Sequence, residues 1–101
     1  MTLKAAFLFV APEADPEIHR TKVTTPAVEL TVVGAPGYAE AERVARQLVE
    51  EGVGAIELCG GFGNEGVARI AKAVGGKAAV GAVRFDFHPR LDWKSGDAIF
   101  G

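Results

Sequence analysis

Apolar runs alternate with helical patterns along this chain, and this alternation constrains the fold more than any other feature. Residues 5–10 are a continuous apolar run typical of a strand buried on both faces of a sheet, and residues 28–33, 55–59 and 79–85 are three further strand-like runs. Apolar residues at helical spacing predict helices over 41–49 and 67–74, ending at Gly52 and at Gly75-Gly76. Because the crossovers are long, the strands are expected to be mainly parallel.

We therefore predict a single small α/β domain over residues 1–101, with a four-stranded, mainly parallel sheet and helical crossovers. Right-handed crossovers leave two strand orders. The preferred order, 2-1-3-4, places the first strand inside the sheet, as in half of a flavodoxin-like fold. The order 1-2-3-4 would give a half-barrel with the first strand at an edge. Asp15-Pro16-Glu17 also predicts a short helix over residues 16–22.

Residues 86–101 form an irregular C-terminal tail without a sustained period, although five large apolar side chains lie in it. A purely solvated tail does not usually carry so much apolar area. The tail therefore either covers the chain's own core or docks on a second subunit.

Composition excludes several classes of protein. Hydrophobic residues make up 49% of the chain and charged residues 24%, which is ordinary globular usage. The net charge of −2, with scattered Lys and Arg, argues against nucleic acid as a partner. No apolar run is long enough for a membrane span, and the single cysteine fits a reducing compartment. We expect a cytoplasmic protein with no membrane partner.

A glycine-dense turn, Gly60-Gly61-Phe62-Gly63-Asn64, follows the third strand and opens the second long helix. Its backbone amides and the helix dipole favour a bound anion, so these five residues are the predicted ligand-binding loop. Residues 61–66 also match G-x-G-x-x-G, but the preceding strand is out of register and no second half holds a dinucleotide. The remaining alternative is a purely structural turn, and the cofactor is left unassigned.

Three residues near the turn are candidates for catalysis. Cys59 lies at a strand end just before a helix N-terminus, where a thiolate is favoured, although a buried cysteine is the commoner situation. Glu57 is a carboxylate within a strand expected to be buried, and it needs a partner. His88 completes the set. The two histidines have no spacing that supports a metal site, so none is predicted.

Further polar residues are expected to join the ligand site. Arg84 and Asp86 alternate with apolar residues and would share a face with His88 if the last strand stays extended. Arg84 is then expected to pair with Glu57, as a structural ion pair or as part of a substrate site. Double winding would also bring Glu13 toward the turn.

The whole chain resembles a small bacterial family catalogued as a domain of unknown function. The resemblance rests on residues 4–7, the Ala11-Pro12 turn, the run Ile56-Glu57-Leu58-Cys59-Gly60-Gly61-Phe62-Gly63, and residues 83–86. It implies a coherent fold and carries no assigned chemistry.

Two functions follow from these observations. The first is binding of a small anionic metabolite at loop 60–64, with or without catalysis. The second is a non-catalytic oligomerising module in which the glycines only permit close packing. In either case we expect a homodimer with Trp93 and Phe100 at or beside the interface.

Overall fold

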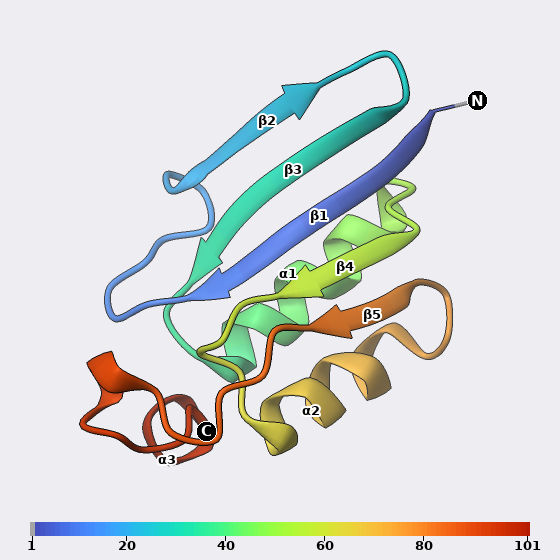
Figure 1. Cartoon of the computed structure of the whole chain (residues 1–101). Coiled ribbons are helices and arrows are strands. Elements are labelled where there is room, and N and C mark those ends of the chain that lie inside the picture. Colours follow the sequence, from blue (N-terminus) through green and yellow to red (C-terminus); the bar gives the residue numbers. More distant parts are fainter. Residues whose placement is uncertain (1) are drawn as a thin grey trace.

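Five strands form one sheet in the computed structural model, which describes residues 2–101 (Figure 1). β1 (Leu3–Val10), β3 (Val28–Ala35), β4 (Ala55–Leu58) and β5 (Ala79–Ala82) are parallel, and β2 (Arg20–Thr24) is antiparallel to β3. The order is β2-β3-β1-β4-β5, so the apolar β1 is central. The small α/β domain with a mainly parallel sheet is confirmed, and the four predicted strands take the preferred order.

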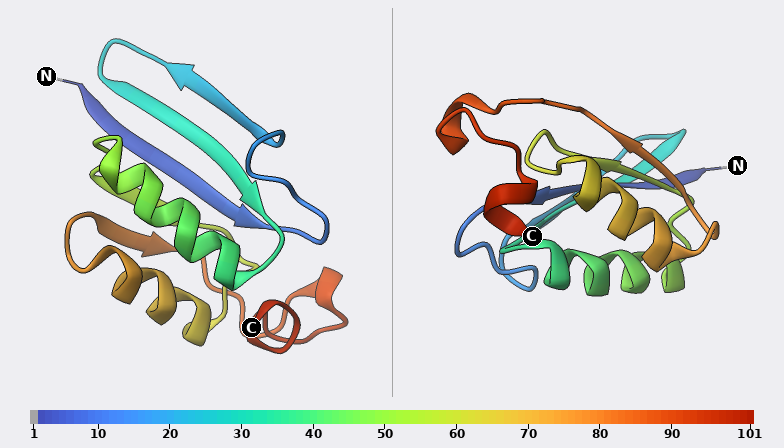
Figure 2. Two further views of the ribbon diagram at one scale, coloured as in Figure 1. Left: turned by 180° about the vertical axis from the view of Figure 1, so that it is seen from behind. Right: turned by 90° about the horizontal axis from the view of Figure 1, so that it is seen from below.

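Both long helices cover the same face of the sheet (Figure 2). They are α1 (Tyr38–Glu50) and α2 (Asn64–Val74), and both were predicted. Their apolar stripes pack on alternate residues of the strands, including Ala6, Leu8 and Ile56, to form the core. The double winding that we expected places helices on both faces, and this part of the prediction is wrong. No helix in residues 2–101 is long and apolar enough to cross a membrane.

The short helix predicted over residues 16–22 does not form. The backbone carbonyl of Asp15 accepts hydrogen bonds from the N–H groups of Ile18 and His19, so the helix-start signal produces a single turn. The chain then enters β2, whose β-branched Thr21 and Val23 suit an extended conformation, and β2 pairs with the outer side of β3. Pairing with β3 thus outweighs the helix-start signal.

The C-terminal segment differs from the predicted extended strand. β5 ends at Ala82, and two short helices follow, η1 (Pro89–Leu91) and α3 (Asp97–Phe100). Phe100 is only 8% exposed and belongs to the core, and Leu91 packs against it. Trp93 is 68% exposed. The segment therefore covers the chain's own core with some of its apolar residues and leaves others in solvent.

Replacing Gly75 by alanine should lower the free energy of unfolding by about 1 kcal/mol, because Gly75 ends α2 in the left-handed conformation, at φ 58°. An added Cβ meets nothing within 4 Å, so the cost is conformational. Urea denaturation of Gly54→Ala is the control, since Gly54 has equal space and no positive φ. Equal effects of the two changes would contradict this explanation.

Candidate functional site

A cavity of about 360 Å³ lies at the carboxyl ends of the two central strands. Its walls come from the end of β1, the loop after β4, and the C-terminal segment. The lining residues are Val10, Ala11, Pro12, Cys59, Gly60, Gly61, His88, Arg90, Leu91 and Phe100. Carboxyl ends of parallel strands beside a reversal of strand order are where α/β proteins usually bind ligands, and the volume is within the range of small-molecule sites.

The loop after β4 is held in place by its own backbone and by the core. The N–H of Cys59 continues the sheet by donating to the carbonyl of Leu8, and the N–H of Phe62 donates to the carbonyl of Cys59. Phe62 is fully buried and stacks on Tyr38, with ring centroids 5.5 Å apart. The loop is therefore anchored by an aromatic side chain that points away from solvent.

The glycines of the loop allow close approach of the C-terminal segment. A Cβ on Gly96 would lie 1.7 Å from the carbonyl oxygen of Gly61, and a Cβ on Gly63 would lie 2.3 Å from Oγ of Ser95. A Cβ on Gly60 would overlap the ring of Phe85. Side chains at these positions would force the two segments apart, so these glycines have a packing role.

The N-terminus of α2 already binds an anion, which is the carboxylate of Asp97. Its Oδ2 accepts the N–H of Glu65 at 2.9 Å, and its Oδ1 accepts the N–H of Gly66 at 3.0 Å and the hydroxyl of Tyr38 at 2.8 Å. The Tyr38 hydroxyl in turn accepts the N–H of Gly63 at 2.9 Å. These contacts satisfy donors that a helix start otherwise leaves without partners.

This network shifts two pKa values. Burial raises the pKa of Asp97, but the amides of Glu65 and Gly66 and the Tyr38 hydroxyl outweigh it, so the net pKa lies below its usual value. Burial, followed by the adjacent Asp97, raises the pKa of Tyr38 despite the opposing contact with the Gly63 amide. The network therefore holds a charged Asp97 against a neutral Tyr38.

Most of the amides in Gly61–Asn64, which were predicted to contact an anion, donate to groups within the chain. The N–H of Gly61 donates to Sγ of Cys59 at 3.3 Å, and those of Phe62 and Gly63 donate to Cys59 and Tyr38. Three of the four expected donors thus have partners within the chain. Side chains are therefore the stronger candidates for holding a ligand at this end of the sheet.

The structure brings Cys59, Gly60, Gly61 and His88 together at the cavity. Nδ1 of His88 accepts the N–H of Arg90 at 3.2 Å, and its ring lies 4.9 Å from that of Phe85. The arrangement places a thiol, an imidazole and a guanidinium around one space. Thiol and imidazole are suited to nucleophilic or acid–base chemistry, and the guanidinium to binding carboxylate or phosphate.

Other predicted site residues lie elsewhere. Glu57 is exposed on the face of the sheet without helices, and the expected pair with Arg84 does not form. Arg84 instead contacts Asp86 and donates to Oδ1 of Asn64 at 2.6 Å. β5 ends at Ala82, so Arg84 lies outside the sheet. Its side chain contacts Asn64 at the start of α2 instead of Glu57 on β4. Glu13 lies in an exposed turn with φ 63° and does not line the cavity.

Sequence reasoning missed Tyr38, Arg90 and Asp97. Tyr38 begins α1, just before the predicted helix over residues 41–49, and the acceptor of its hydroxyl group lies 59 residues away in the sequence. Asp97 is an acid in a segment without a period. Only the tertiary fold brings it to α2.

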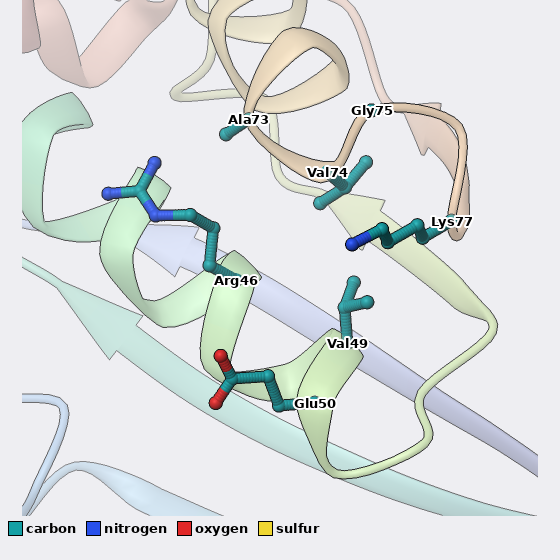
Figure 3. A pocket seen from close by; sticks show the side chains of 7 residues that line it. All are labelled: Arg46, Val49, Glu50, Ala73, Val74, Gly75 and Lys77. Atoms are coloured by element: carbon teal, nitrogen blue, oxygen red, sulfur yellow. The ribbon is translucent and has the colours of Figure 1, made fainter.

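A second hollow, of about 210 Å³, lies between the C-terminal ends of α1 and α2 (Figure 3). Arg46, Glu50 and Lys77 are its charged residues. It is smaller than the first cavity and contains no residue of the predicted site. In residues 2–101, no three His, Cys, Asp or Glu side chains are grouped so that they could hold a metal ion.

Comparison with known proteins identifies the family. The model of DUF6506, described as a family of unknown function, matches residues 3–98, and the chain belongs to this family. This confirms the resemblance to a family of unknown function. Searches of the curated proteins and of the solved structures found no match.

Proposed function

We propose that the protein is a cytosolic binding protein for a small anionic molecule, held in the cavity at the carboxyl ends of β1 and β4. The observation that supports this most is that Arg90 and His88 line the same cavity as the glycine turn. A guanidinium matches the geometry of carboxylate and phosphate groups. The apolar residues Val10, Leu91 and Phe100 supply the rest of the wall, as in most small-molecule sites.

Cys59 and His88 are the two members of the predicted catalytic set that share this cavity. A bound molecule would contact both. We assign no reaction to them, and Glu57, on the open side of the sheet, is outside the proposed site.

Titration with inorganic phosphate should shift the amide NMR signals of Gly60, Gly61 and His88 at millimolar concentrations. Arg90→Ala should weaken this binding by about tenfold or more, because it removes a charged hydrogen-bonding partner. Lys94→Ala is the matched control, since Lys94 is an exposed cation of the same segment that does not line the cavity.

Shifts confined to Arg46 and Lys77 would move binding to the hollow between the helices and contradict the proposal. An equal loss of binding in Lys94→Ala would show that phosphate responds only to the general positive charge of the segment.

A second candidate function is that of a non-catalytic oligomerising module. It is supported by the close packing of Gly63 against Ser95 and Asp97 and of Gly61 against Val10, which explains these glycines without a ligand. The interface predicted at Trp93 and Phe100 needs correction, because Phe100 is buried in the chain's own core. Trp93 remains an exposed candidate.

A further inference from the structure

The face of the sheet opposite α1 and α2 has no helix on it (Figures 1 and 2). We call it the open face. Residues that are paired across adjacent strands point to the same side of the sheet. The core residues Leu8, Val33 and Leu58 point toward the helices. The residues next to them along each strand therefore point to the open face. The open face consists of Leu3, Ala5, Phe7, Phe9, Thr21, Val23, Val28, Leu30, Val32, Gly34, Ala55, Glu57, Ala79 and Gly81.

Charge is distributed very unevenly between the two sides of the sheet. Glu57 is the one charged strand residue on the open face among the described residues. The other side carries an exposed ion cluster, in which Glu29 lies 3.8 Å from Lys4 and 3.6 Å from Lys22. A face so poor in charge and so rich in large apolar side chains is typical of a surface that is covered in the assembled protein.

The two edges of the sheet are poor sites for pairing with another chain. β2 is exposed along its whole length and carries Arg20 and Lys22. β5 has only four residues. Charged side chains and short length both discourage edge-to-edge pairing. The open face is therefore the better surface for association.

The size of the open face can be compared with that of a dimer interface. With strands about 4.8 Å apart and about 3.3 Å per residue, the sheet presents on the order of 450 Å² in projection. Leu3 and Val23 on this face are 49% and 52% exposed, and Val83, which follows β5, is 54% exposed. Standard interfaces bury roughly 800 Å² per partner, so a dimer would use the whole open face together with the apolar residues that follow β5.

The shape of the open face is also self-complementary. Phe7, Phe9, Leu30 and Val32 form a ridge over β1 and β3, and the ring of Phe9 lies over Gly34. Ala55, Ala79 and Gly81 leave a low region over β4 and β5, where a Cβ on Gly81 would meet nothing within 4 Å. A two-fold axis parallel to the strands and between β1 and β4 would bring the ridge of one copy over the low region of the other.

We propose that two copies of this chain pack through their open faces into a two-layered sheet sandwich. The strands of the two sheets then cross at about 30°, the usual angle for aligned sheets. The proposal goes beyond the proposed function and does not depend on it, because the ligand cavity lies at the end of the sheet and the dimer uses its face.

Sedimentation equilibrium of the full chain at about 100 µM should give twice the chain mass of 10.6 kDa. Val32→Glu should be monomeric at this concentration, because it places a charge on the apolar ridge. Trp93→Ser is the matched control, since Trp93 is more exposed but lies off the open face, and this variant should stay dimeric. Circular dichroism establishes that the variants are folded.

Glu57→Gln tests the same surface without a risk to folding, because Glu57 is exposed. Burial of a charge opposes association, so this variant should lower the dimer dissociation constant by about tenfold. A monomeric wild-type chain, a dissociation constant unchanged by Glu57→Gln, or a dimer broken by Trp93→Ser would each overturn the proposal. Phosphate titration of the monomeric Val32→Glu variant reports on the ligand cavity separately.

Discussion

Replacing Phe62 by alanine is expected to lower the free energy of unfolding by about 3–5 kcal/mol. Phe62 is fully buried in the loop after β4, and its ring stacks on Tyr38 with an interplanar angle of 9°. The change removes this contact and leaves a cavity between the loop and α1. Urea denaturation followed by circular dichroism measures the effect.

The control is Phe87→Ala, because Phe87 is 67% exposed and its removal should cost less than about 0.5 kcal/mol. Phe62→Leu, which retains most of the volume, should cost no more than about 1.5 kcal/mol and keeps the comparison measurable if the alanine variant unfolds. Similar denaturation midpoints for Phe62→Ala and Phe87→Ala would show that the loop is not anchored by this ring.

Replacing Asp97 by alanine should cost about 2–3 kcal/mol, which is in the range of an N-cap combined with a hydrogen bond to a charged group. The carboxylate accepts two amides of α2 and the Tyr38 hydroxyl, and its loss leaves all three donors without this acceptor. Hydrogen exchange at Glu65 and Gly66 should become faster. Asp86→Ala is the matched control, because Asp86 forms only an exposed ion pair with Arg84.

The contribution of Asp97 should depend on pH. Its pKa in the folded chain is lowered, because the hydrogen bonds from Glu65, Gly66 and Tyr38 outweigh the opposing effect of burial. Its stabilisation is therefore present above the unfolded pKa of about 3.9 and is lost as the pH falls through the lower folded value. The stability difference between wild type and Asp97→Asn should shrink below about pH 4. A difference that stays constant would contradict the role of the charge.

Most of the fold could be predicted from the sequence because the strong patterns are local. The apolar run predicts that β1 is buried, and the helical spacing of apolar residues predicts the buried faces of α1 and α2. Glycines indicate where both helices end. The edge strand β2 could not be predicted, because a helix-start signal at Asp15 competes with pairing to β3, which lies further along the chain. Tertiary pairing decides such cases.

Four of the residues predicted for the site line one cavity, and the site itself stays a prediction. Cys59, Gly60, Gly61 and His88 meet at one cavity, since the end of β4 and the C-terminal segment converge there. The partners of the amides at the start of α2 could not be predicted from the sequence, because the chain supplies the carboxylate of Asp97 from 31 residues beyond Gly66. No local sequence pattern predicts that contact.

The distance along the chain between α2 and its capping carboxylate makes the start of this helix depend on the far end of the chain. While residues 95–97 are not in place, the amides of Glu65 and Gly66 lack their acceptor and nothing fills the space beside Gly63. Docking of the C-terminal segment fills that space and completes the start of the helix together. A partly folded chain that lacks this docking step is therefore expected to have a frayed first turn of α2.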